Sequence, residues 1–97
     1  MNHLDEILTV LRDNGKLQSD IRFCESGELC FTWLALKQVL AQASGHRHIR
    51  SDLKIVGNGW WLERDQWDGD DFWVFKTTPN QSRALLDEIY DLNIFAY

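Results

Sequence analysis

The chain is poor in proline, cysteine and methionine, with one Pro, two Cys and one Met among 97 residues. It also lacks any apolar run approaching the roughly 20 residues of a membrane span. Residues 1–6 contain neither a basic stretch nor a continuous apolar segment, so they do not read as a signal peptide. We therefore expect a cytoplasmic protein that keeps Cys24 and Cys30 as thiols.

Positive charge is also scarce, because ten Lys and Arg face fifteen Asp and Glu, for a formal net charge of −5. This balance favours solubility and argues against non-specific binding to DNA or to an anionic membrane. Hydrophobic residues make up 44% of the chain and charged residues 26%, a composition that excludes a disordered chain. The length fits one domain with one core, spanning residues 1–97.

Apolar residues recur at helical spacing in three segments, which predict helices at residues 3–14, 33–44 and about 79–91. Asn2 and Thr32 are suitable N-caps for the first two. The third has the strongest start signal, since Thr78 can cap it, Pro79 suits the first helical position and Gln81 completes a capping box.

Short apolar runs bounded by turn residues predict strands at residues 21–23, 29–31, 53–56, 60–67 and 72–77. Asn58-Gly59 and Asp68-Gly69 are typical of tight hairpin turns. The first turn predicts that Ile55 pairs with Leu62 and that Lys54 faces Glu63. The fold class is therefore α+β: three helices packed on a small antiparallel sheet in the order α-ββ-α-βββ-α, with an apolar tail docked on the body.

The hairpin from Trp60 to Lys76 carries aromatic residues on both of its faces. A loop of two or four residues at Asp68-Gly69 places Trp73 and Phe75 on the same face as Trp60, beside Arg64, whereas a three-residue loop with a bulge exchanges the two sets. We favour the first register, because it builds the more apolar face. A sheet with helices on one face then leaves at least one aromatic side chain exposed to solvent.

An exposed aromatic patch with a polar rim is typical of a protein interface. We therefore expect a small acidic, non-enzymatic interaction protein, such as an inhibitor, adaptor or subunit, which needs no cofactor. A homodimer through the same hairpin is a close variant. The predicted partner-binding residues are Trp60, Trp61, Trp67, Asp68, Asp70, Asp71 and Trp73.

The basic segment at residues 46–54 supports an alternative, a nucleic-acid-binding module that stacks bases on a surface tryptophan. Its short length and the acidity of the whole chain favour a simpler interpretation, in which cations complement the carboxyl end of the second helix. The residues of this alternative site are His46, Arg47, His48, Arg50 and Lys54.

A metal-dependent or hydrolytic enzyme is a third hypothesis. Cys24, Cys30, His46 and His48 supply thiols and imidazoles, but their spacing does not match an ordinary zinc motif. The acidic turn around Gly69 also fails the calcium-loop pattern of EF-hands. No phosphate-binding loop or catalytic signature marks an active site, so we predict no catalytic and no metal-binding residues.

Overall fold

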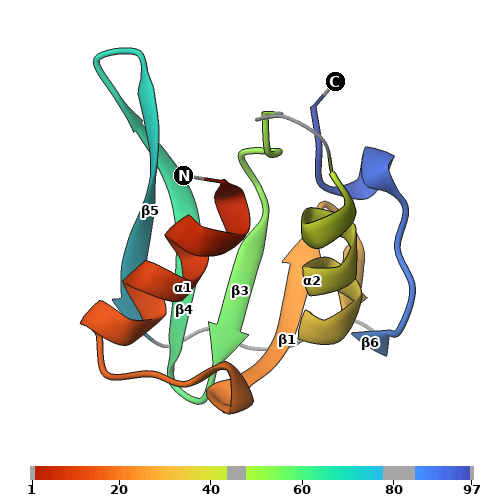
Figure 1. Ribbon diagram of the computed structural model, residues 1–97, viewed down its shortest axis with the longest axis horizontal. Coiled ribbons are helices and arrows are strands. Elements are labelled where there is room, and N and C mark those ends of the chain that lie inside the picture. The colour runs from red at the N-terminus through yellow and green to blue at the C-terminus, as the bar shows by residue number, and fades with distance from the viewer. Residues whose placement is uncertain (1, 44–47, 78–84, 97) are drawn as a thin grey trace.

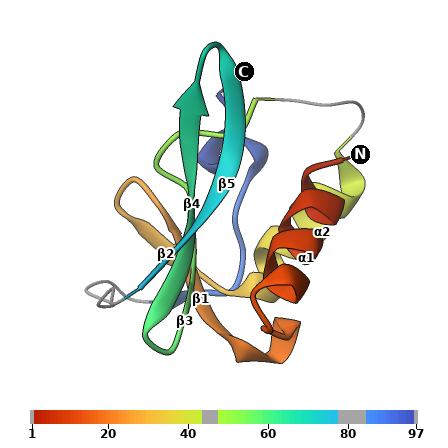
Figure 2. The same cartoon turned by 90° about the vertical axis from the view of Figure 1, so that its left-hand side faces the viewer.

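The computed structural model describes residues 2–43, 48–77 and 85–96, which form two layers. Two α-helices lie on the same side of a six-stranded sheet, whose strand order is β5-β4-β3-β1-β2-β6 (Figures 1 and 2). The elements in chain order are α1 (His3–Asp13), η1 (Gln18–Asp20), β1 (Ile21–Ser26), β2 (Leu29–Phe31), α2 (Trp33–Gln42), β3 (Lys54–Gly57), β4 (Trp60–Trp67), β5 (Asp70–Thr77), β6 (Leu85–Leu86) and η2 (Asp91–Asn93).

Both described helices begin at the predicted caps. The side-chain oxygen of Asn2 accepts a hydrogen bond of 2.8 Å from the backbone N–H of Asp5, and Thr32 Oγ1 accepts one of 3.1 Å from the N–H of Ala35. Each cap satisfies one of the amide donors that a helix start leaves without an internal partner. The predicted helices at residues 3–14 and 33–44 are thereby confirmed within about one turn.

The main core lies between the helices and the sheet. The side chains of Ile7, Phe31, Leu36, Ile55 and Leu62 are all completely buried there. Along each strand, every second side chain points to the opposite face of the sheet. On that face, Phe23, Cys30 and Val56 form a second, smaller cluster against which Trp61 packs.

The β3–β4 hairpin has the predicted register, since Ile55 pairs with Leu62 and Lys54 with Glu63. The last residue of β3, Gly57, must be glycine. A Cβ atom at Gly57 would overlap the indole ring of Trp60, which lies directly on the glycine backbone. This close approach is one way in which a buried tryptophan is accommodated next to a tight turn.

The prediction of three helices is wrong, because the described part of the chain contains two α-helices and residues 85–91 are not α-helical. Leu85 and Leu86 instead form β6, and Thr32 N donates a 2.6 Å hydrogen bond to Leu86 O. Apolar residues at helical spacing do not distinguish a helix from a short strand followed by a loop, and pairing with β2 decides the outcome. The predicted helix start at Thr78, Pro79 and Gln81 lies outside the described residues.

The predicted antiparallel sheet is also wrong, since β6 runs parallel to β2 and makes the sheet mixed. The short hairpin β1–β2 is not separate from the meander, because β1 pairs with β3 and joins all six strands. The docked tail is confirmed: Ile94 and Phe95 are buried, and Ile49 forms an isolated bridge with Phe95.

Candidate functional site

The β4–β5 hairpin rises beyond the other strands of the sheet (Figures 1 and 2). Its turn is the two residues Asp68 and Gly69, with φ angles of 52° and 84°. Two successive positive φ values define a type I′ turn, for which Asp-Gly is a preferred sequence. The turn sets the favoured register, so Arg64 pairs with Trp73 and Leu62 with Phe75.

The lower half of the hairpin, which we call the root, turns one face toward the helices. Trp60 and Trp73 are only 4% and 8% exposed, and the rings of Trp60 and Phe75 stack with centroids 5.6 Å apart. The guanidinium carbon of Arg64 lies 4.8 Å from the centre of the Trp73 ring, as expected for a cation–π contact. These aromatic residues belong to the core.

The upper half of the hairpin, residues 65–72, we call the tip. Trp67 is 77% exposed there and Phe72 is 41% exposed. Trp67 pairs with Asp70, and Phe72 with Asp65, so the two aromatic side chains are diagonal neighbours on the face that points away from the helices. They form the aromatic part of the candidate site, and they confirm that an aromatic residue of the hairpin faces solvent.

Carboxylates surround this aromatic pair. Asp65, Asp68 and Asp70 are exposed, and Asp65 and Asp70 lie on the same face as Trp67. The acidic side chains and the rings therefore share one accessible surface. Asp71 belongs to the opposite face and contacts the base of the tip.

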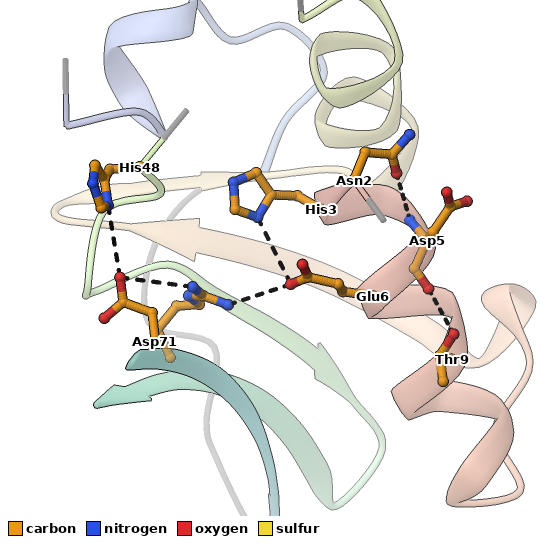
Figure 3. A network of polar contacts seen from close by, with 8 residues as sticks. Asn2, His3, Asp5, Glu6, Thr9, His48 and Asp71 are labelled. Atoms are coloured by element: carbon orange, nitrogen blue, oxygen red, sulfur yellow. Dashed lines mark hydrogen bonds and ion pairs between the residues drawn. The ribbon is translucent and has the colours of Figure 1, made fainter. Parts of the chain in front are cut away.

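Figure 3 shows that base, where His3 lies beside Glu6 and His48 lies beside Asp71. Arg64 lies between these two carboxylates. Its guanidinium nitrogens lie 3.9 Å from Glu6 and 4.0 Å from Asp71. His3 lies 4.0 Å from the same Glu6 carboxylate, and His48 lies 3.6 Å from that of Asp71. Burial lowers the pKa of Arg64, while the two carboxylates oppose that shift. The network fastens the start of α1 to the hairpin.

A depression of about 490 Å³ lies beside this network, lined by residues that include His48, Ser51, Arg64, Gln66 and Asp71. Its walls present a guanidinium, an imidazole and carboxylates together. Such a mixture does not select an anion or a cation, because each charge in the wall has a neighbour of opposite sign.

Six of the seven predicted partner-binding residues divide into two groups, and the seventh, Asp71, belongs to the network around Arg64. Trp67, Asp68 and Asp70 lie together at the tip. Trp60 and Trp73 are buried in the root, and Trp61 is half-buried, with its indole N–H donating to Glu63 at 3.1 Å. Phe72 was not among the predicted site residues, although the alternation of the strand places it beside Trp67.

The basic segment proposed for nucleic acid is only partly described, because His46 and Arg47 lie outside the described residues. His48 faces Asp71, Arg50 Nε lies 3.4 Å from Asp52, and Lys54 pairs across the sheet with Glu63. Each of these three basic side chains therefore has a carboxylate beside it. Nucleic-acid binding stays a prediction, and loss of binding at low salt in an Arg50→Ala variant is its direct test.

The cysteines point to opposite faces of the sheet. Cys24 belongs to the main core and Cys30 to the smaller cluster, and both are free and buried. Burial raises the pKa of the Cys24 thiol well above its ordinary value. Among the residues that the structure describes, no three His, Cys, Asp or Glu side chains are grouped to hold a metal ion.

None of the helices formed by the described residues is long and apolar enough to cross a membrane. No protein-family model, no curated protein and no solved structure matches the chain.

Proposed function

We propose that the protein is a non-enzymatic binding domain that inserts the hairpin tip into an apolar pocket on a basic partner protein. The observation that carries this proposal is the 77% exposure of Trp67 beside the half-exposed Phe72. Both residues lie on strands that need no aromatic side chain at these positions for packing, because the core ends at the root of the hairpin.

A tryptophan offers a large apolar surface at a low cost in conformational entropy, and tryptophan is enriched among residues that dominate binding energies. The two-residue turn and the continuous ladder of β4 and β5 set the relative positions of Trp67 and Phe72 before any partner binds. Such preorganisation lowers the entropy lost on association.

The charge of the tip indicates the kind of partner. Asp65, Asp68 and Asp70 place three exposed carboxylates around the rings, and the chain as a whole has a formal charge of −5. A basic rim around the partner's pocket would complement these carboxylates and would accelerate association at low salt.

The two cysteines are consistent with a cytoplasmic location as part of this proposal. Their side chains face opposite sides of one sheet, so they do not form a disulfide with each other in this fold. A domain that relies on packing alone suits a reducing compartment.

The test is site-specific crosslinking followed by affinity measurement. A photoreactive phenylalanine analogue replaces Trp67 in the full chain, and the crosslinked protein is identified and purified. Calorimetry then compares the wild type with Trp67→Ala and Phe72→Ala, and we expect each variant to bind at least about 30-fold more weakly, the effect of a hot-spot residue.

Tyr90 provides the matched control, because it is also 77% exposed but lies far from the hairpin in sequence. Tyr90→Ala should leave the affinity unchanged. Equal affinity of the wild type and both tip variants for the crosslinked protein would exclude the tip as the interface.

A further inference from the structure

We propose that two copies of this chain form a dimer by pairing their β5 strands in antiparallel orientation, with Trp73 at the two-fold axis. The six described strands of each copy then form one continuous sheet. This inference concerns the edge strand β5, which shares Asp70 and Phe72 with the tip but does not contain Trp67. Variants of Trp67 therefore test the partner site separately from the dimer.

Among the described strands, β5 forms one edge of the sheet. It spans Asp70–Thr77, lies at one end of the strand order, and pairs only with β4 among the described strands. Its pairing with β4 is continuous over eight residue pairs, with no bulge, and it contains no proline. Protein sheets usually protect a long edge by such irregularities, and an unprotected edge is a template for another strand. The other end of the sheet is β6, a strand of only two residues.

The hydrogen-bonding groups of β5 alternate in direction. A two-residue loop is closed by a hydrogen-bonded pair, here Trp67 and Asp70, and hydrogen-bonded and non-hydrogen-bonded pairs then alternate along the ladder. The N–H and C=O groups of Asp71, Trp73 and Phe75 consequently point away from β4. Three consecutive donor–acceptor pairs are thereby presented at the edge.

The distribution of charge favours a second copy as the occupant. In an antiparallel pair related by a two-fold axis, residues that face each other share the same side of the sheet. With Trp73 at the axis, Asp70 of one copy faces Lys76 of the other, and this contact occurs twice. The same register places Phe72 opposite Val74, also twice, and aligns Trp73 with its own copy as a hydrogen-bonded pair.

Neighbouring registers lose this complementarity. An axis at Val74 places Phe72 opposite Lys76, and an axis at Phe72 places Asp70 opposite Val74. Of these three registers, only the one with the axis at Trp73 places an acidic residue opposite a basic residue on each side of the two-fold axis. It leaves Trp67 accessible, because Trp67 lies on β4 and not at the edge.

The experiment uses charge reversal in the full chain. Native mass spectrometry and sedimentation measure the dimer of the wild type, of Asp70→Lys and of Lys76→Glu. Each single variant places like charges face to face twice, and we expect a dissociation constant about tenfold higher than that of the wild type. Mixing the two variants restores both attractive contacts, so the heterodimer should form in preference to either homodimer.

Asp87→Lys is the matched control, since it makes the same charge change at an exposed position outside the sheet. It should dimerise like the wild type, and so should Trp67→Ala, which separates this proposal from the partner site. A second measurement needs no variant: the amides of Asp71, Trp73 and Phe75 should exchange more slowly as the protein concentration rises.

A wild type that remains monomeric at millimolar concentration overturns the proposal, and so does exchange at these three amides that is independent of concentration. A mixture of the two charge variants that shows no preference for the heterodimer overturns the register.

Discussion

The root and the tip of the β4–β5 hairpin both contain aromatic residues, which are buried at the root and exposed at the tip. Trp73 at the root is 8% exposed, whereas Trp67 at the tip is 77% exposed. Both lie on strands of one ladder, and both pair with a residue on the neighbouring strand. Two features determine how exposed each side chain is. One is the face of the strand to which it points, and the other is how far α1 extends along the hairpin.

Arg64 marks the boundary between the two regions. Its side chain is only 7% exposed, and it lies between the ring of Trp73 and the carboxylates of Glu6 and Asp71. Below it the inner face of the hairpin is apolar, and above it the inner face carries Gln66 and Asp71. A single charged residue thus closes the core and joins it to the start of α1.

The largest effect is expected from truncating the tryptophans. Trp73→Ala should lower the free energy of unfolding by about 3–5 kcal/mol, because it leaves a large cavity in the core. Trp67→Ala should change it by no more than about 0.5 kcal/mol. Urea unfolding monitored by circular dichroism measures both. Equal losses in the two variants would mean that the tip is packed as firmly as the root.

A smaller loss is expected from Arg64→Ala. The substitution removes the cation–π contact and leaves the partly buried carboxylates of Glu6 and Asp71 without their shared counter-charge, at a cost of about 2 kcal/mol. Arg12→Ala is the control, since the side chain of Arg12 is 77% exposed. The same denaturant titration measures both variants. If Arg64→Ala lowers the free energy of unfolding no more than Arg12→Ala does, Arg64 does not stabilise the boundary between root and tip.

The turns of the β3–β4 and β4–β5 hairpins offer a third comparison. Gly59 and Gly69 have φ angles of 83° and 84°, and a Cβ atom would meet no neighbour at either position. Alanine therefore introduces backbone strain alone, about 1 kcal/mol. Gly59→Ala should lower global stability by that amount, while Gly69→Ala should lower it less and instead accelerate amide exchange at the tip, which can open locally. A larger loss of global stability in Gly69→Ala than in Gly59→Ala would contradict a tip that opens separately.

The smallest effect concerns the pair formed by Glu63 and Lys76 on the outer face. The hydrogen bond from Lys76 lowers the pKa of Glu63, and the hydrogen bond to Glu63 raises the pKa of Lys76. The contribution of Glu63 is present above its unfolded-state pKa and is lost as the pH falls through the folded value. The contribution of Lys76 is present below its unfolded-state pKa and is lost as the pH rises through the folded value.

Stability profiles of the wild type and of a Glu63→Gln variant should therefore differ most between about pH 4.3 and 10.4, and converge outside that window. A constant difference between the two profiles from pH 2 to 12 would assign the effect of Glu63 to its hydrogen bond with Trp61 rather than to its charge.

Local chemistry explains which parts of this fold were predictable. The caps Asn2 and Thr32 and the turns at Asn58-Gly59 and Asp68-Gly69 act within a few residues. The sequence therefore predicts the first two helices and the registers of the β3–β4 and β4–β5 hairpins. The register in turn places Arg64 beside Trp73, as expected.

The errors arise where distant segments meet. The spacing of Leu85, Leu86, Ile89 and Tyr90 fits a helix, and only the pairing of residues 85–86 with β2 reveals a strand. The burial of Trp60 and Trp73 and the contact between Glu6 and Arg64 likewise depend on where α1 packs. No pattern within either segment carries that information, because the hydrophobic effect has no direction.

The docked C-terminal segment has a consequence for the order in which the molecule assembles. Arg50 N donates a hydrogen bond to Ile94 O, Ala96 N donates one to His48 O, and the Ser26 hydroxyl donates one to Asn93 O. These contacts join residues that are separated by 44 to 67 positions in the sequence. The turn of the β4–β5 hairpin, by contrast, contains only two residues. Long-range contacts must overcome a larger loop-closure entropy. We therefore expect the hairpin to form early and the C-terminal segment to dock late, as the step that completes folding.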